Sequence, residues 1–263
     1  MNITFSLAQI HSIYGDEGSN FLKASEMVAE AARRHSQIIL LPELWSTGGV
    51  SEELIHLAVP LNQGIFARIS MLARENHICI LGSNLCSLEQ GKYGNTAVFF
   101  DADGSIRASY TKIHLFSLMN EDHYLTSGEH LTLVEEKWGK AGLSICYDLR
   151  FPELYRTYAF AGAQMVFVSA AWPHPRLHHW QTLLRARAIE NQMYIIACNQ
   201  SGMVKDTCFF GHSCIIDPWG ETLIEAGETE VLLTATIEMD VVNKIRNKMP
   251  VLADRKPEAN VIK

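Results

Sequence analysis

The chain has 263 residues, of which 48% are hydrophobic and 19% are charged, and its formal net charge at pH 7 is −7. This balance is typical of a globular protein with a substantial core. It argues against a nucleic-acid partner, because phosphate binding needs a basic face and the chain carries no cluster of lysines and arginines.

No apolar run approaches the roughly 20 residues that cross a bilayer, and the first residues lack the basic start and cleavage site of a signal peptide. The 6 cysteines lie mostly inside apolar, strand-like runs. Such a distribution fits reduced thiols better than the disulfide framework of a small secreted domain. We therefore expect a cytoplasmic protein that has no membrane partner.

Strand and helix signals alternate through the first half of the chain. Apolar residues at helical spacing predict helices, and short apolar runs predict strands. A turn of acidic residues and glycine between two such runs predicts a hairpin. In chain order, the predicted elements are a strand at 3–10, a helix at 20–35, a strand at 38–41, a helix at 64–76, a strand at 78–82 and a hairpin of 95–100 with 105–110.

The second half continues the alternation. Its predicted elements are strands at 131–134 and before Cys146, a helix at 152–161, a strand at 165–169, a helix at 179–191, a strand at 194–198, a hairpin of 213–216 with 222–224, and a strand at 231–237 before a short helix. No linker rich in Pro, Gly and Ser divides the chain, so we expect one domain over 1–263, with 250–263 as a tail or arm. Hairpins mixed with crossover helices predict a mixed sheet, or two, and the pattern leaves that number open.

Cys146 stands between an apolar run and a helix start at Pro152. Proline suits the first helical position, because its ring presets φ and its missing N–H has no partner there. A cysteine on such a strand-to-helix turn is expected to be exposed at the carboxyl edge of a sheet. The positive end of the helix then favours the nucleophilic thiolate. The alternative interpretation is that Cys146 is a small buried hydrophobe.

Two other charged residues end apolar runs. Glu43 follows Pro42 after a run that reads as a strand buried on both faces. A carboxylate there is either solvated at a rim or held in a cleft as an acid or base. Lys112 lies among β-forming residues at the end of the first hairpin, where a lysine usually covers a sheet edge. Each signal alone leaves both interpretations open.

In the chain order Glu43, Lys112, Cys146, the sequence resembles the carbon–nitrogen hydrolases of the nitrilase superfamily. The matching stretches are Leu-Pro-Glu, Tyr-Thr-Lys-Ile-His-Leu-Phe, Cys-Tyr-Asp-Leu-Arg-Phe-Pro-Glu-Leu and the run 180–192. Ala171-Trp172-Pro173 and His179-Trp180 favour the omega-amidase branch, whose members hydrolyse the side-chain amide of 2-oxo acids. The resemblance implies an α-β-β-α sandwich of two mixed sheets flanked by helices, and a homodimer or larger homo-oligomer.

The resemblance also implies the catalytic roles. Cys146 is the nucleophile, Glu43 moves its proton, and Lys112 stabilises the oxyanion, which are the parts that amide cleavage needs. Glu121 begins a stretch that matches the family's Glu-x-x-Tyr-x-x-x-Gly, where the glutamate holds the lysine and orients the substrate. Asp122 lies one place off that register. The alternative for Glu121 is a solvated acidic loop.

An acidic substrate calls for an arginine fork. Arg176 is the best candidate by its loop position. Arg150 lies closer in sequence to the nucleophile, and its alternative role is to lock the turn by an ion pair with a neighbouring acid. Phe116, Tyr147 and Trp172 are candidates to line the pocket. Ordinary packing is the alternative for each of these aromatic residues.

Two rival sites have less support. His174 and His178 are one helical turn apart and His179 follows, but Pro175 interrupts a helix and no Cys or acid joins them at ligand spacing. We therefore expect no metal and no cofactor. A Cys-His protease needs a histidine base, and His114 is the nearest in motif terms. Its place beside Lys112 is more consistent with a structural role.

The sequence therefore predicts a cysteine-dependent amidohydrolase that converts a small, carboxylate-bearing amide to acid and ammonia through a thioester. An N-carbamoyl amidohydrolase and a nitrilase remain alternatives, since a nitrilase uses the same three residues. A catalytically silent scaffold with the same fold is the alternative outside enzymes. The complete Glu-Lys-Cys set argues against it.

Overall fold

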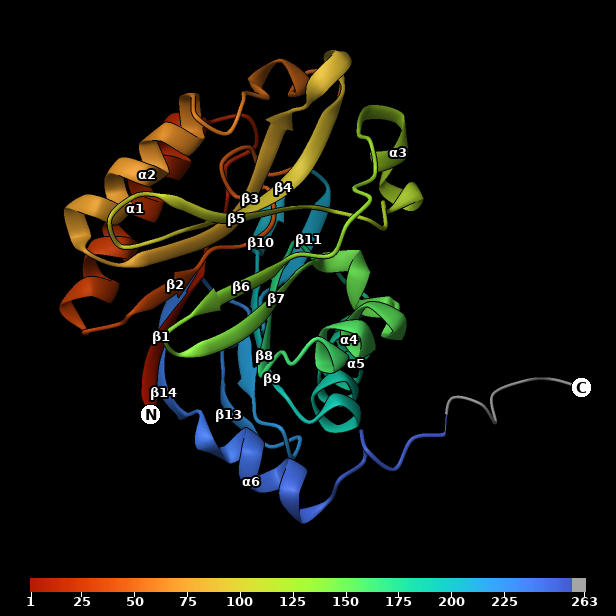
Figure 1. Ribbon diagram of the computed structural model, residues 1–263. Coiled ribbons are helices and arrows are strands. Elements are labelled where there is room, and N and C mark those ends of the chain that lie inside the picture. Colours follow the sequence, from red (N-terminus) through yellow and green to blue (C-terminus); the bar gives the residue numbers. More distant parts are fainter. Residues whose placement is uncertain (257–263) are drawn as a thin grey trace, which may run out of the picture.

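The computed structural model describes residues 1–256 (Figure 1). The predicted tail at 250–263 therefore lies partly outside the described residues, which end before 257. Two six-stranded sheets form the centre of the molecule. Of the helices in the described part, none has both the length and the apolar character that a bilayer span requires.

The first sheet has the order β14-β1-β2-β3-β4-β5. Its strands are β1 (Asn2–Gln9), β2 (Ile38–Leu40), β3 (Cys79–Ser87), β4 (Tyr93–Phe100), β5 (Ile106–Thr111) and β14 (Val231–Glu238). β1, β2 and β3 are parallel neighbours, because helices carry the chain back between them. The hairpins and β14 add antiparallel pairs, so the sheet is mixed.

The second sheet has the order β13-β12-β9-β8-β7-β6. Its strands are β6 (Leu133–Glu136), β7 (Gly139–Ile145), β8 (Met165–Ala170), β9 (Tyr194–Asn199), β12 (Cys214–Ile216) and β13 (Thr222–Glu225). The central strands β7, β8 and β9 are parallel, and antiparallel strands flank them on both sides. This sheet is therefore mixed in the same way as the first.

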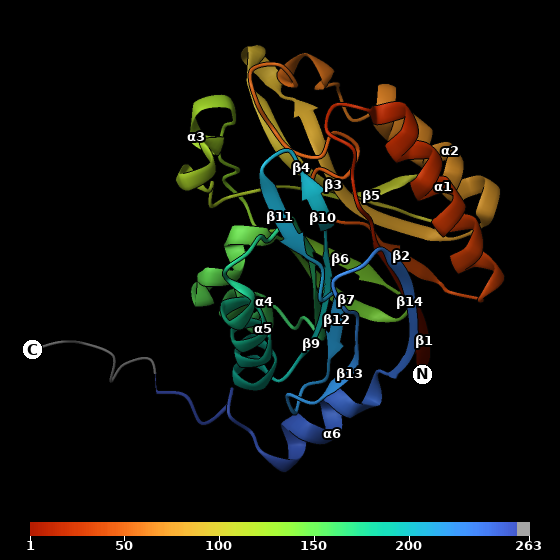
Figure 2. The same ribbon diagram turned by 180° about the vertical axis from the view of Figure 1, so that it is seen from behind.

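Helices cover the two outer faces. α1 (Glu17–Arg33) and α2 (Gly64–Asn76) pack on the first sheet, and α4 (Pro152–Phe160) and α5 (Leu177–Asn191) pack on the second (Figures 1 and 2). Asp16 caps α1 by accepting a hydrogen bond from the Ser19 N–H. α6 (Asp240–Lys248) follows β14. The predicted α-β-β-α sandwich of two mixed sheets is confirmed.

Aromatic rings join the inner faces of the two sheets. The ring centroid of Phe167 in β8 lies 5.9 Å from that of Phe5 in β1 and 6.3 Å from that of Phe99 in β4. Close to them, the Ser169 hydroxyl donates a 3.0 Å hydrogen bond to the Leu41 carbonyl. Such buried contacts hold the strand ends of one sheet against those of the other.

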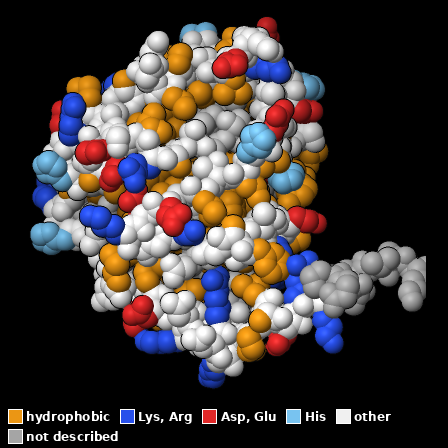
Figure 3. All heavy atoms as spheres, viewed as in Figure 1, with side chains coloured by type: hydrophobic (Ala, Val, Ile, Leu, Met, Phe, Trp, Pro, Cys, Tyr) orange, Lys and Arg blue, Asp and Glu red, His pale blue; other side chains and the backbone are white. Residues whose placement is uncertain are grey.

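The structure adds elements that the patterns did not predict. A two-stranded hairpin, β10 (Ser201–Val204) and β11 (Thr207–Phe210), leaves the second sheet after β9. β3 is also longer than predicted and extends to Ser87. A short helix, α3 (Glu121–Tyr124), follows β5. On the face shown in Figure 3, acidic and basic side chains are interspersed.

Candidate active site

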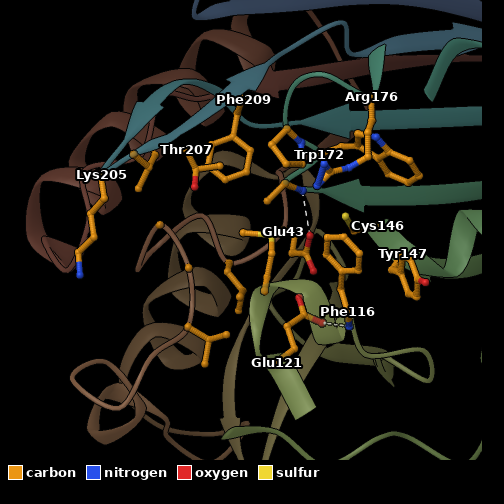
Figure 4. A pocket seen from close by; sticks show the side chains of 18 of the residues that line it. Glu43, Phe116, Glu121, Cys146, Tyr147, Trp172, Arg176, Lys205, Thr207 and Phe209 are labelled. Carbon is orange, nitrogen blue, oxygen red and sulfur yellow. Dashed lines mark hydrogen bonds between the residues drawn. The ribbon is translucent and has the colours of Figure 1, made fainter. Parts of the chain in front are cut away.

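Three strand ends meet at one end of the sandwich. Glu43 follows β2, Lys112 follows β5, and Cys146 follows β7 in the other sheet. The Lys112 ammonium lies 2.7 Å from Glu43 Oε1 and 2.8 Å from the Glu121 carboxylate. Figure 4 shows Glu43, Glu121 and Cys146 facing the same cavity. The structure therefore brings together the four residues that the sequence singled out.

Glu43 is held by hydrogen bonds on both carboxylate oxygens. Oε1 accepts from Asn95 Nδ2 at 2.7 Å and from the Lys112 ammonium. Oε2 accepts from the Ala171 N–H at 2.9 Å, the bond that is drawn as a dashed line at Glu43 in Figure 4. The Gln200 side chain also donates to the Glu43 backbone carbonyl. With only 2% of Glu43 exposed, these contacts fix one orientation of its carboxylate.

Lys112 is completely buried between two acids. Burial opposes its charge, but Glu121 and Glu43 outweigh that effect and raise the pKa of Lys112 well above its usual value. The lysine is therefore an ammonium at neutral pH. It does not line the cavity itself, whereas both of its acidic partners do.

Glu121 is the acid in contact with the lysine, and Asp122 is exposed. Its second contact is the Phe116 N–H, which donates to Oε2 at 2.8 Å. Burial raises the pKa of Glu121, against the opposing effect of the Lys112 charge. A solvated acidic loop is therefore the wrong interpretation for Glu121.

Cys146 differs from the expectation of an exposed thiolate. Only 6% of the residue is exposed, and burial, followed by the charge of Glu43, raises the pKa of its thiol well above the usual value. Its φ of 45° is a left-handed conformation that side chains rarely adopt. The sulfur is thus a protonated thiol on a strained turn, aimed into the cavity beside a carboxylate (Figure 4).

Asp148 holds this turn in place. Its buried carboxylate accepts hydrogen bonds from the Ile145 N–H, the Tyr110 hydroxyl and the His114 backbone N–H. The His114 ring also bonds to Asp148 and stacks on Phe151 with ring centroids 3.6 Å apart. The contacts of His114 are therefore structural, as predicted, and they tie the end of β5 to the nucleophile turn.

The cavity above Cys146 has a volume of about 140 Å³ and is open to solvent. All five residues predicted to bind substrate line it: Phe116, Tyr147, Arg150, Trp172 and Arg176. The Arg150 guanidinium lies 4.7 Å from the centre of the Trp172 ring, and that of Arg176 lies 5.5 Å from the centre of the Phe116 ring. Neither arginine forms an ion pair with an acid of the described residues. The idea that Arg150 locks the turn to a neighbouring acid is therefore wrong.

Other lining residues were missed by the sequence analysis. The unpredicted hairpin β10–β11 contributes Val204, Lys205, Thr207 and Phe209 (Figure 4). The Lys205 ammonium lies 3.5 Å from the centre of the Tyr14 ring, which places the hairpin tip against the loop after β1. The two residues between Val204 and Thr207, Lys205 and Asp206, form the turn, but they include neither the glycine nor the asparagine that marks a two-residue hairpin in a sequence.

His174, His178 and His179 do not form a metal site with other side chains. Among residues 1–256, no group of three His, Cys, Asp or Glu side chains is arranged to hold a metal ion. All six cysteines are free thiols.

The profile of the family described as carbon-nitrogen hydrolase matches residues 4–247. The chain belongs to this family. It is 38% identical over 254 residues to a 2-oxoglutaramate amidase of Bacillus subtilis, covering 97% of this chain and 98% of that protein. It is 32% identical over 270 residues to the omega-amidase NIT2 of Mus musculus, covering 97% and 96%. The predicted likeness to the omega-amidase branch is confirmed, and the protein is a hydrolase of carbon–nitrogen bonds other than peptide bonds.

Solved structures agree with this assignment. A CN-hydrolase superfamily protein from Xanthomonas campestris superposes with a TM-score of 0.92 at 28% identity, over 100% of both chains. A Glu-to-Gln variant of an amidase from Nesterenkonia superposes with a TM-score of 0.87 at 27% identity, over 98% of this chain and 95% of that chain. In that amidase, the acetamide moiety of fluoroacetamide is covalently attached to the active-site cysteine.

Proposed function

We propose that this protein is an omega-amidase, which hydrolyses the terminal amide of a small 2-oxo acid such as 2-oxoglutaramate. The observation that carries the proposal is the hydrogen-bonded set of Glu43, Lys112 and Glu121 beside Cys146 in one cavity. The names of three relatives that are 38%, 39% and 32% identical to this chain support the choice of substrate.

In the first half of the reaction, the Cys146 sulfur attacks the amide carbonyl and Glu43 accepts the thiol proton. Glu43 then passes this proton to the amide nitrogen, the C–N bond breaks, and ammonia leaves an acyl thioester on Cys146. In the second half, Glu43 takes a proton from water, and the hydroxide attacks the thioester carbonyl. The acid product leaves, and the proton returns to the sulfur.

Each attack places negative charge on the carbonyl oxygen. We assign its stabilisation to the backbone N–H of Tyr147, which follows the nucleophile, and to the positive charge of the Lys112 ammonium, which lies directly behind the carboxylates of Glu43 and Glu121 at the cavity wall. The loss of one donor of this kind typically lowers the rate by about 10²–10³-fold. Glu121 keeps Lys112 in position through its 2.8 Å ion pair.

The acidic end of the substrate needs a cation in the same cavity. Arg176 is our choice for the carboxylate, with Arg150 as a second guanidinium on the wall that bears Trp172. Both guanidinium groups lie over aromatic rings. Arg150 Nη2 also donates a 3.4 Å hydrogen bond to His179 Nδ1, whereas the N–H groups of Arg176 are available to a bidentate acceptor. Phe116, Tyr147 and Trp172 supply apolar contact with the short carbon chain.

Release of ammonia from a panel of substrates tests the proposal. We expect turnover of 2-oxoglutaramate, and little or none of nitriles or N-carbamoyl amino acids. Preference for a nitrile or a carbamoyl compound would replace the proposed substrate with one of the two alternatives. Cys146→Ala is expected to abolish turnover, whereas Cys79→Ala, which removes a half-buried thiol outside the cavity, leaves it unchanged. Near-normal turnover by Cys146→Ala would refute the mechanism.

We further propose that residues 1–263 act as one domain, and that the protein works in the cytoplasm as a homodimer or larger homo-oligomer. The shared core of the two sheets supports a single domain. The free thiols support a cytoplasmic location. The assembly rests on the family likeness. Light scattering during gel filtration measures it directly.

A further inference from the structure

Asn95 contacts both charged partners of the catalytic set from one position on β4. Its side-chain Nδ2 donates a 2.7 Å hydrogen bond to Glu43 Oε1, and its backbone carbonyl accepts a 2.9 Å bond from the Lys112 N–H. The residue is completely buried and does not line the cavity, so substrate does not reach it. We propose that Asn95 is a positioning residue that selects which oxygen of Glu43 exchanges the catalytic proton. This inference rests on the proposed role of Glu43.

The acceptor sites of Glu43 show how the selection works. Each carboxylate oxygen has about two acceptor sites. On Oε1, both sites are used, by Asn95 Nδ2 and by the Lys112 ammonium. On Oε2, the Ala171 N–H uses one site and leaves the other open. The thiol proton of Cys146 is therefore directed to Oε2, the oxygen that keeps an open acceptor site.

The chemistry of an amide suits this task better than a second cation. Asn95 donates to the carboxylate without adding charge, so the ion-pair balance between Glu43, Glu121 and Lys112 is unchanged. The orientation of the amide is also fixed, because turning it over would place its oxygen against a carboxylate oxygen. β4 holds the backbone rigidly, since Asn95 pairs with Leu85 of β3 on one side and bonds to Lys112 on the other.

A neighbouring residue provides a matched control. Asn84 lies on β3, opposite Thr96, and is as buried as Asn95. Among the described residues, neither its amide nitrogen nor its oxygen has a hydrogen-bond partner. Substitution of either asparagine by the similarly sized leucine disturbs a buried strand position, but only Asn95→Leu removes a donor from Glu43.

The test follows the reactivity of Cys146, which needs no knowledge of the substrate. Iodoacetamide alkylation of Cys146 is measured by peptide mass spectrometry from pH 5 to 9, with Cys208 in the same chain as the reference thiol. We expect Asn95→Leu to slow alkylation of Cys146 and to lower kcat by about 10- to 100-fold, the range for a hydrogen bond to a charged group. KM should change by less than about threefold, because Asn95 does not touch the cavity.

The pH profile separates positioning from packing. The titratable groups that face Glu43 are Lys112, Glu121 and Cys146, and all three remain in the variant. With the Asn95 donor gone, the pH dependence of Cys146 alkylation should differ from that of the wild-type protein, whereas that of the reference thiol Cys208 should not. Asn84→Leu should leave both profiles, the alkylation rate and kcat at their wild-type values.

Three results would overturn the role of Asn95: unchanged alkylation of Cys146 in Asn95→Leu, equal losses in Asn95→Leu and Asn84→Leu, or a change confined to KM. If Asn95→Leu does not fold, shown by rapid alkylation of every cysteine, Asn95→Ser is judged by the same criteria. Failure of the wild-type protein to release ammonia from 2-oxoglutaramate, with the alkylation results as expected, would reject the substrate and retain the positioning role.

Discussion

The two sides of the cavity are held by different kinds of contact. On the side of the first sheet, Glu43 and Lys112 are fixed by hydrogen bonds of 2.7 Å. On the side of the second sheet, Arg150 and Arg176 rest on aromatic rings at 4.7 and 5.5 Å. Hydrogen bonds between buried charges allow one geometry, whereas stacking allows a side chain to turn. The side of the first sheet therefore holds the reacting groups in one arrangement, whereas the arginines on the side of the second sheet are free to adapt to the substrate.

Lys112→Met tests the rigid side and should have the largest effect. The change leaves Glu43 and Glu121 buried without their common cation, and breaking such a pair costs about 3–5 kcal/mol. We expect turnover to fall by at least about 10²–10³-fold. Urea unfolding and ammonia release measure the two effects. Lys244→Met, at an exposed ion pair with Glu238, should alter neither. A stable, active Lys112→Met protein would contradict the assigned role.

Arg176→Ala tests the adaptable side. A guanidinium bond to a carboxylate is worth about 1.5–3 kcal/mol, so KM for acidic amides should rise about 10- to 100-fold. Neutral amides and the unfolding free energy should change little, because Arg176 makes no ion pair among the described residues. Arg185→Ala, further along α5 and outside the cavity, is the control. An equal rise in KM for neutral and acidic amides would remove Arg176 from substrate recognition.

A smaller effect is expected from pH alone. Burial raises the pKa of Cys79 to about 12, of Tyr194 to about 12, and of Cys198 well above its usual value. A group whose pKa is higher in the folded state stabilises fully below its unfolded value and loses that contribution as pH rises. Stability should therefore fall between about pH 9 and 12, by about 1.4 kcal/mol per pH unit for a fully buried thiol.

Urea unfolding from pH 7 to 11 measures this loss. Cys198→Ala should reduce the alkaline slope, because it removes one completely buried thiol. Because Cys198 lies outside the cavity, Cys198→Ala should change this pH dependence of stability without changing turnover at neutral pH. Stability that stayed constant to pH 11 would show that these thiols and phenols are not protected from ionisation.

Much of this fold was predictable, because regular periodicity marks regular elements. The predicted helix at 64–76 has the same bounds as α2, and both predicted hairpins form. The hairpin at 201–210 was missed, because Gly202 and Lys205 interrupt its apolar pattern. Lys205 itself adopts a positive φ. Glycine and asparagine indicate such a turn position in a sequence, and lysine does not.

The residues of the site were predictable, but the protonation state of the nucleophile was not. Motif spacing indicated Glu43, Lys112 and Cys146, yet the protonated thiol follows from burial next to a carboxylate, and only the tertiary structure supplies that. Asn95 was visible only as the start of a strand. A polar residue at a strand end has many ordinary roles, so its contact with Glu43 could not be inferred from the sequence.

The pairing of β1 with β14 has a consequence for synthesis on the ribosome. β14 covers the edge of β1 along its whole length, although the two strands are the first and last in residues 1–256. Until residue 238 has been translated, β1 presents an open row of N–H and C=O groups that can recruit another nascent chain. A stop codon just before β14 is thus expected to yield an aggregating product, even though every residue of the catalytic set has already been made.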